Sequence, residues 1–200
     1  MNDSLIDDGV IKYVAIHKSS IAPVHADLNE LDGIRTKLFD LGLIGAYPGG
    51  VGYGNVSIRC ESGCIISGTS TGSLRELGAD GYCYVRSFDI QNNTVHTEGP
   101  LKASSESMTH CSIYEANSLV KCVLHIHSLE LWNRLLDEKY PSTSAEIPYG
   151  TPQMALRMAE LVNAQENQFG VFVMSGHREG IVAYGESINS AFDQIKRILN

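Results

Sequence analysis

The sequence predicts an α/β protein with a central, mostly antiparallel sheet and helices packed on it. Strand-like and helix-like segments are mixed along the chain, without the strict alternation that is typical of a parallel sheet. Hydrophobic residues make up 43% of the chain and charged residues 19%, which is typical of a globular protein. At 200 residues the length fits one domain, so we expect a single domain over residues 1–200, with residues 1–25 as an N-terminal extension.

The first half of the chain predicts one helix followed by short strands. Apolar residues recur at helical spacing within residues 26–45, and Gly42 is a suitable end for that helix. After a glycine-rich turn, PGGVGYGN, the alternating segments 56–60 and 64–68 predict a hairpin. Residues 81–90 predict a further strand that ends at the turn signal QNNT. The helical apolar positions are Leu28, Leu31, Ile34, Leu38 and Leu41.

The second half of the chain predicts three helices and three strands. Ser104 or Ser105 is the natural N-cap of the first helix, because a hydroxyl can accept a hydrogen bond from a free amide. Thr151 caps the second helix, and Pro152 follows at its first position, where the missing N–H costs nothing. The third helix is amphipathic. These elements are helices at 103–118, 151–167 and 187–199 and strands at 120–129, 169–176 and 180–185.

Charge and composition exclude several classes of function. The net charge of −8 argues against a surface for nucleic acid or an anionic membrane. No apolar run approaches the roughly 20 residues that span a bilayer, and the start of the chain shows no secretory signal. The five cysteines are odd in number and irregularly spaced, so we expect reduced thiols and a cytoplasmic location.

The stretch VLHIHS predicts a metal site. His125 and His127 stand two residues apart in an apparent strand, so their side chains point to the same face. A single buried histidine is usually a core residue that bonds to the backbone, but two on one face are hard to satisfy without a cation. A catalytic zinc ion usually has three protein ligands and one open position. The candidate third ligand is His177, at the end of the strand VFVM.

The other four histidines are weaker candidates. His17, His25 and His96 lie in segments that predict surface positions. His110 follows Glu106 by one helical turn, so it either neighbours the site or packs the helix.

Six segments, in this order along the chain, resemble the class II aldolase/adducin family. They are GYGNVSIR, IISGTSTG, ASSESMTHCSIYEA, VLHIHS, PYGT and SGHREGIVAYG. Members of this family include fuculose phosphate aldolase, ribulose phosphate epimerase and methylthioribulose phosphate dehydratase. The resemblance runs from about the first helix to the C-terminus. It implies a three-layer α/β/α fold, one Zn²⁺ or other divalent ion per chain, and a homotetramer with sites at subunit interfaces.

The resemblance also assigns roles to individual residues. His125, His127 and His177 match the metal ligands, and Glu106 matches the acid/base glutamate. Chemistry supports an anion site here, since a helix start offers free amides and a glycine-rich loop lets the backbone approach a phosphate. The residues that match the phosphate-binding elements are Gly54, Asn55, Ser104 and Ser105.

Two departures from the family pattern concern the motif of the third histidine and the second phosphate-binding element. The third histidine usually precedes glycine directly, whereas here Arg178 and Glu179 intervene and either contact substrate or form an exposed ion pair. The second phosphate element usually reads TPSG. Here IISGTSTG offers two alignments, so Ser67, Gly68 and Ser70 are all candidates for phosphate binding.

A third departure concerns tyrosines. Aldolases of this family protonate the aldehyde oxygen with tyrosines from a mid-chain segment and a C-terminal tail. Tyr140 or Tyr149 is the candidate for the first role, and the sequence shows no tail tyrosine.

Together these features predict a zinc-dependent, aldolase-type lyase of carbohydrate metabolism. It would cleave or form a C–C bond in a small, phosphorylated ketose or hydroxy-carbonyl compound, through a metal-stabilised enediolate. The alternatives are an epimerase, a dehydratase or a decarboxylase of the same family, or a non-catalytic, adducin-like assembly domain. The expected partners are a small sugar phosphate and other copies of the chain, with no nucleic acid and no membrane.

Overall fold

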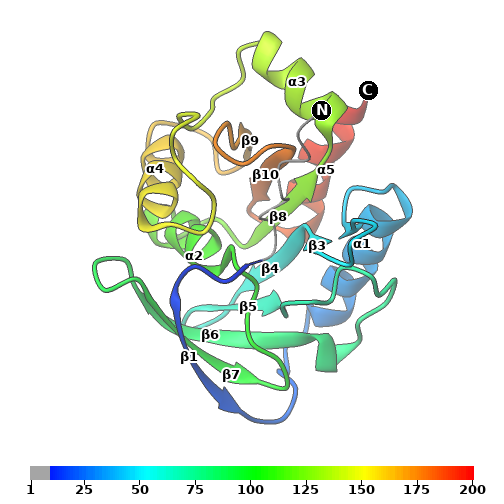
Figure 1. Cartoon of the computed structure of the whole chain (residues 1–200), viewed down its shortest axis with the longest axis vertical. Helices are drawn as coiled ribbons and strands as arrows, with labels where there is room; N and C mark the ends of the chain where they lie inside the picture. The colour runs from blue at the N-terminus through cyan, green and yellow to red at the C-terminus, as the bar shows by residue number, and fades with distance from the viewer. Residues whose placement is uncertain (1–9) are drawn as a thin grey trace.

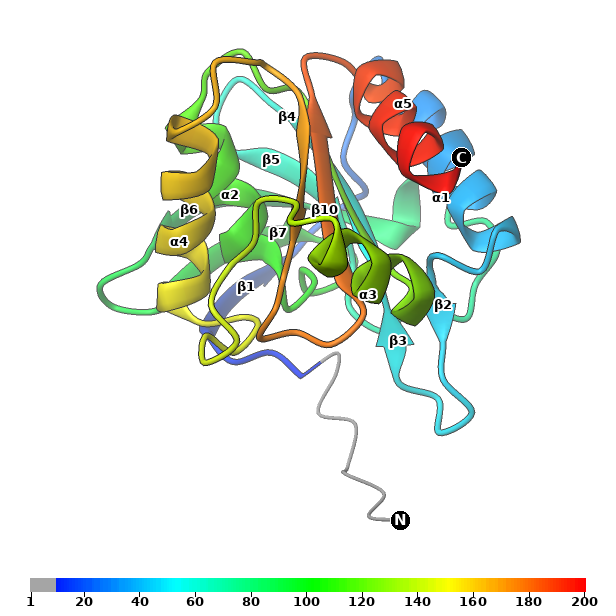
Figure 2. The ribbon, with the colours of Figure 1, turned by 90° about the horizontal axis from the view of Figure 1, so that it is seen from above.

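A computed structural model describes residues 10–200, which form three layers with a large sheet in the middle (Figures 1 and 2). The eight strands lie in the order β1-β7-β6-β5-β4-β8-β10-β9. Every neighbouring pair is antiparallel except β1 and β7, which are parallel. The strands are β1 Val14–Ser19, β4 Asn55–Arg59, β5 Cys64–Ser67, β6 Tyr82–Asp89, β7 Thr94–Gly99, β8 Cys122–His127, β9 Gly170–Val173 and β10 Gly180–Gly185.

Five helices cover the two faces of the sheet (Figure 2). Helices α2 and α4 pack on one face and share a core cluster with β5, β6 and β8. Helices α1, α3 and α5 contribute to the core cluster on the other face. The helices are α1 Leu28–Asp40, α2 Ser107–Ala116, α3 Leu129–Asp137, α4 Pro152–Asn163 and α5 Ile188–Leu199. This arrangement confirms the predicted three-layer α/β/α fold with a mostly antiparallel sheet.

Two smaller elements lie beside the sheet. A short hairpin pairs β2 (Gly45–Ala46) with β3 (Gly52–Tyr53), and the glycine-rich turn forms its tip. A 3₁₀ turn, Ala79–Gly81, leads into β6. The sequence PGGVGYGN therefore follows β2, contains β3 and ends at Asn55, the first residue of β4.

Several predicted boundaries agree with the structure. Helix α1 ends just before Gly42, whose φ of 72° is the left-handed conformation that glycine adopts after a helix. The hydroxyl of Thr151 accepts a hydrogen bond from the Met154 amide, so Thr151 is the N-cap of α4 as expected. The predicted hairpin strands at 56–60 and 64–68 correspond within one residue to the paired strands β4 and β5.

The predicted cap of α2 is wrong. The N-cap is Glu106, which makes no side-chain capping bond, and Ser104 and Ser105 lie in the turn before it. That turn is closed by Ser107 instead, whose amide and hydroxyl both donate to the Ser104 carbonyl, at 3.1 and 2.6 Å. The hydroxyls of Ser104 and Ser105 therefore do not cap the helix. The structure also adds elements that the patterns did not predict, namely β1, β7, α3, the short β2–β3 hairpin and the 3₁₀ turn before β6.

The N-terminal segment contributes an edge strand. β1 lies within residues 1–25 and pairs with β7, while residues 1–9 of the predicted extension lie outside the described residues. The assignment of the whole chain to one domain stays a prediction. Among residues 10–200, no helix is long and apolar enough to cross a membrane.

Arg35 joins α1 to the loop that follows β5. Its guanidinium is buried and donates to the carbonyls of Thr71 at 3.0 Å and Arg75 at 2.8 Å, and also to that of Leu74. Since a buried carbonyl without a donor is costly, Arg35 holds residues 71–75 against the helix.

We expect Arg35→Met to lower the free energy of unfolding by about 2–3 kcal/mol, because three carbonyls lose their donor. Urea denaturation followed by circular dichroism measures the change. Arg157→Met on α4 is the matched control, since its side chain is exposed and forms a surface ion pair with Glu160. Equal effects for the two variants would contradict this role of Arg35.

Candidate active site

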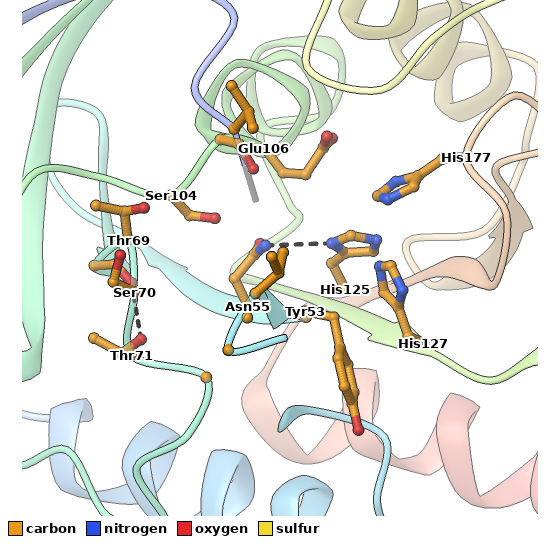
Figure 3. A pocket seen from close by; sticks show the side chains of 18 residues that line it. Tyr53, Asn55, Thr69, Ser70, Thr71, Ser104, Glu106, His125, His127 and His177 are labelled. Atoms are coloured by element: carbon orange, nitrogen blue, oxygen red, sulfur yellow. Dashed lines mark hydrogen bonds between the residues drawn. The ribbon is translucent and has the colours of Figure 1, made fainter. Parts of the chain in front are cut away.

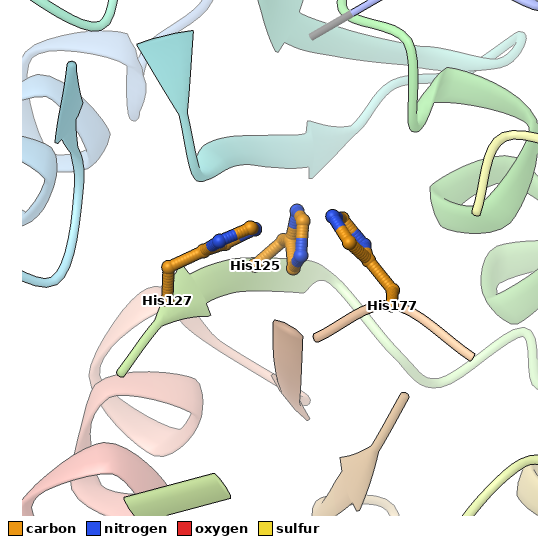
Figure 4. Close-up of side chains that lie close together, drawn as sticks. All are labelled: His125, His127 and His177. Carbon is orange, nitrogen blue, oxygen red and sulfur yellow. The ribbon is translucent and has the colours of Figure 1, made fainter. Parts of the chain in front are cut away.

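Three buried histidines converge where the interior strand β8 ends (Figures 3 and 4). His125 and His127 come from β8, and His177 comes from the turn between β9 and β10. One nitrogen from each ring lies within 4.8 Å of the other two. Nitrogens that share a tetrahedral zinc ion lie about 3.3 Å apart, given bond lengths of about 2.0–2.1 Å. Inward movements of about 1 Å or less thus bring this cluster to coordination distance.

The pairing of β8 explains the first two ligand candidates. β8 is an interior strand, with His125 opposite Asn55 of β4 and Val182 of β10. The alternating Leu124 and Ile126 point into the core cluster of α1 and α5. His125 and His127 therefore share the opposite face, on which α2 packs.

A tight turn places the third histidine. The His177 amide donates to the Met174 carbonyl, and the His177 carbonyl accepts from Gly180, both at 2.9 Å. Gly176 is required within this turn, because a Cβ atom there would lie 2.0 Å from the carbonyl oxygen of Ile147. The ring of His177 stacks on Tyr149, with centroids 4.5 Å apart.

The ring of His125 fits a bound cation. Its Nε2 atom is buried and has no hydrogen-bond partner among residues 10–200, while its Nδ1 lies 3.3 Å from the Asn55 amide. Burial, followed by the nearby His177 and His110, holds the pKa of His125 well below its usual value. The ring is thus neutral, which is the form that binds a metal ion. A cation at this point would remove the cost of the unpaired nitrogen.

Glu106 lies across the pocket from the histidines (Figure 3). Only 1% of the residue is exposed, and its Oε2 accepts a hydrogen bond of 2.7 Å from Thr109 one turn along α2. The same pocket is lined by Glu106 and all three histidines. A carboxylate held in this way can exchange a proton with a molecule in the pocket.

The pocket has a volume of about 290 Å³, and its lining combines the three histidines with hydroxyl side chains and glycine-rich backbone. No lysine or arginine lines it within the described part of the chain. Anion binding would therefore depend on hydroxyls and backbone amides. The lining consists of residues 50–55, 68–72 and 104–106, together with Val10 and the three histidines.

Most of the predicted phosphate-binding residues line this pocket. Gly54 has a φ of 74°, and a Cβ atom there would lie 2.7 Å from Ile44 and 3.0 Å from the His125 carbonyl, so only glycine fits. Ser67 does not line the pocket, since it is the last residue of β5 and its hydroxyl accepts from the Val56 amide at 3.2 Å. The predicted residues that do line it are Gly54, Asn55, Gly68, Ser70, Ser104 and Ser105.

The two tyrosine candidates have different surroundings. Tyr149 is buried against His177, and the Lys12 ammonium lies 3.7 Å from the centre of its ring. Tyr140 packs with the core cluster on the opposite face of the sheet. Neither tyrosine is among the residues that line the pocket. The structure therefore brings only Tyr149 close to the histidines.

Sequence reasoning missed several residues of the site. Thr69, Thr71 and Tyr53 line the pocket. Tyr47 contacts His127 and donates to Glu179, whose role the sequence left open. The neighbouring Arg178 is exposed. Tyr47 stands next to the glycine-rich turn, which was the one sign of it in the sequence. No local pattern shows that a tyrosine there contacts a histidine 80 residues away.

The four remaining histidines lie outside the cluster. His110 is fully buried in α2, with its Nδ1 2.7 Å from the Ser57 hydroxyl, and it packs the helix without lining the pocket. His17, His25 and His96 are not buried, in agreement with the prediction.

Comparisons with known proteins identify the family and support the fold. Residues 49–198 match the model of the "Class II Aldolase and Adducin N-terminal domain" family. No curated protein matches the chain.

Three solved structures illustrate the similarity of fold. The L-fuculose-1-phosphate aldolase of Thermus thermophilus superposes with a TM-score of 0.61 at 20% identity, over 85% of this chain and 87% of that one. A sugar-phosphate aldolase of Thermotoga maritima gives 0.61 at 18% identity, over 84% and 88%. YgbL of Escherichia coli, named for three alternative activities (aldolase, epimerase and decarboxylase), gives 0.61 at 22% identity, over 85% and 83%. At these identities the likeness establishes the fold alone.

We expect the purified chain to bind about one divalent ion, and His125→Ala to lose it, because three ligands become two. Elemental analysis after dialysis measures the content. His96→Ala, on the exposed side of β7, is the control and should bind like wild type. Full metal content in the His125 variant would contradict the three-ligand site.

The buried ring of His110 should make the free energy of unfolding depend on pH. Burial lowers its pKa to about 3, whereas the unfolded chain binds the proton near about pH 6.5. Between these values the unfolded state holds one more proton, so the free energy of unfolding falls with falling pH, by up to about 1.4 kcal/mol per pH unit.

His110→Gln should flatten this slope, and His96→Gln should leave it unchanged. Urea denaturation at several pH values across the window measures both. An unchanged slope in the His110 variant would show that this ring does not couple folding to protons.

Proposed function

This chain belongs to the class II aldolase and adducin family, and from that premise we propose that it is a metal-dependent, aldolase-type lyase. Its substrate would be a small, phosphorylated ketose or related hydroxy-carbonyl compound, whose C–C bond it cleaves or forms. The observation that carries the proposal is that three buried histidines and a buried carboxylate line the same pocket as a glycine-rich loop. The homotetramer and the cytoplasmic location stay predictions.

His125, His127 and His177 would hold the ion, with zinc the first candidate, because three neutral imidazoles suit it and leave a position open for substrate. A divalent ion bound there would supply Lewis-acid stabilisation for negative charge that develops on substrate oxygens. The buried Nε2 atom of His125 supports this assignment.

Glu106 would move the proton in the reaction. Its carboxylate is excluded from water and fixed by the Thr109 hydroxyl, so it can protonate or deprotonate a substrate atom in one orientation. Glu106 is also the N-cap of α2, where it lies next to the free amides of that helix. Glu106 lines the same pocket as the three histidines, so it would face a substrate bound there.

The substrate phosphate would bind at the far side of the pocket from the histidines. Ser70 and Ser104 lie on that side (Figure 3), and Ser105 and residues 50–55 also line the pocket. These donors are neutral, so they would bind an anion by hydrogen bonds and not by ion pairs. The volume is small, in accord with a substrate of a few carbons.

Other reactions of the family share the same intermediate. Epimerase, dehydratase and decarboxylase chemistry would all use the ion and Glu106, and would differ in the group that meets the second carbonyl. The position of Tyr140 on the other face of the sheet removes one candidate for aldehyde protonation. A non-catalytic assembly domain would need neither the histidine cluster nor the buried carboxylate.

We expect Glu106→Gln to keep its metal and to lose turnover by about 100-fold or more, because the amide cannot exchange a proton. A screen of ketose phosphates and their unphosphorylated analogues, with detection of the aldehyde, epimer or CO₂ released, measures turnover. Glu115→Gln, exposed on the same helix, is the control. Full activity in the Glu106 variant would refute its role, and turnover only of unphosphorylated compounds would refute the phosphate site.

A further inference from the structure

A tyrosine and a glutamate join the glycine-rich hairpin to the histidine cluster. The Tyr47 hydroxyl lies 3.1 Å from the Nδ1 atom of His127 and donates to the Oε2 atom of Glu179 at 3.0 Å. These residues come from the β2–β3 hairpin, the end of β8 and the turn before β10. Three segments that are distant in the sequence thus meet at one side of the His127 ring.

The direction of these bonds fixes the tautomer of His127. A hydroxyl has one hydrogen, and here it goes to the carboxylate, which can only accept. Nδ1 of His127 must then carry a hydrogen and donate it to the Tyr47 oxygen. The lone pair is left on Nε2, and Nε2 is the nitrogen available for a cation.

Glu179 holds this position in an unfavourable backbone conformation. Its φ is 74°, in the left-handed region that glycine adopts and that a residue with a side chain rarely does. The carbonyl of Glu179 also accepts from the Ser128 amide at 3.0 Å, which ties the turn to the start of α3. A strained residue that persists beside a cluster of ligand candidates points to a role for its side chain.

The backbone of Tyr47 is fixed by the hairpin turn. Its amide donates to the Val51 carbonyl and its own carbonyl accepts from Gly50, so the tight turn of the hairpin sets its direction. Its ring packs on Tyr53, with centroids 4.7 Å apart, and Tyr53 in turn lies 5.5 Å from the His127 ring. The β2–β3 hairpin and the ring of His127 therefore pack against each other.

We propose that Tyr47 and Glu179 are positioning residues that hold His127 in the tautomer and orientation required to bind a divalent ion. This inference rests on the proposed metal site and adds to it the outer partners of one ligand. Such partners orient a ligand and raise its basicity, and their loss typically weakens metal affinity by about 10- to 100-fold.

The test is zinc affinity of the purified chain, measured by competition with a chromophoric chelator. We expect Tyr47→Phe and Glu179→Gly each to weaken binding by about 10- to 100-fold. Glu179→Gln keeps an oxygen that accepts from Tyr47, so its affinity should stay within about threefold of wild type by the same reasoning. With Co²⁺ in place of zinc, the visible spectra of Tyr47→Phe and Glu179→Gly should differ from the wild-type spectrum. The spectrum of Glu179→Gln should match it.

Two controls separate this role from a purely structural one. Lys139→Gly removes a side chain from another left-handed position, with φ of 60°, at an exposed site after α3. Tyr84→Phe removes a hydroxyl that bonds to the backbone amide and carbonyl of Val24, away from the histidines. Both should bind zinc like wild type. In the metal-free state, Glu179→Gly should melt no lower than wild type, because glycine relieves the backbone strain.

The outcomes are distinguishable. Wild-type affinity in Tyr47→Phe and Glu179→Gly would overturn this inference while leaving the metal site intact. Weaker binding that follows a lower melting temperature in both variants would overturn it as well, since the effect would then be one of folding. Absence of zinc binding by wild type would overturn the proposed function, and this inference with it.

Discussion

The alternation of side chains along β8 is the constraint on which the rest of the site depends. Because β8 lies between β4 and β10, its register is fixed on both sides, and a slip by one residue would turn every side chain to the other face. Leu124 and Ile126 belong to the core beneath α1 and α5. His125 and His127 are thereby directed to the face of α2, where Glu106 begins the helix.

Several polar groups in this region are held by contacts between segments that are distant in the sequence. Asn55 meets His125 across the β4–β8 ladder, Ser57 meets His110 from the same strand, and Arg35 holds the loop at residues 71–75 from a helix on the other face. Each contact satisfies a buried group that would otherwise be costly. The result is a rigid wall around a pocket whose own donors are uncharged.

The sequence predicted the parts of this structure that depend on local patterns. The pair His125 and His127 follows from spacing along a strand, and Gly54 follows from the turn that precedes β4. Tyr47 and Glu179 could not be found in this way, since 80 and 132 residues separate Tyr47 from its two partners. Ser67 and Ser70 have similar local sequence, and only the end of β5 decides which of them faces the pocket. β1 escaped prediction because Val14 and Ile16 are exposed, so its pattern does not resemble a half-buried strand.

The parallel pairing of β1 with β7 has a consequence for the newly made chain. About 80 residues separate the two strands, as the contact between His17 and Thr97 shows. At a synthesis rate of about 5–20 residues per second, β1 leaves the ribosome roughly 4–16 s before its partner. During that time the backbone amides and carbonyls of Val14–Ser19 have no partner strand, so this segment stays open to pairing with other strands until β7 has been made.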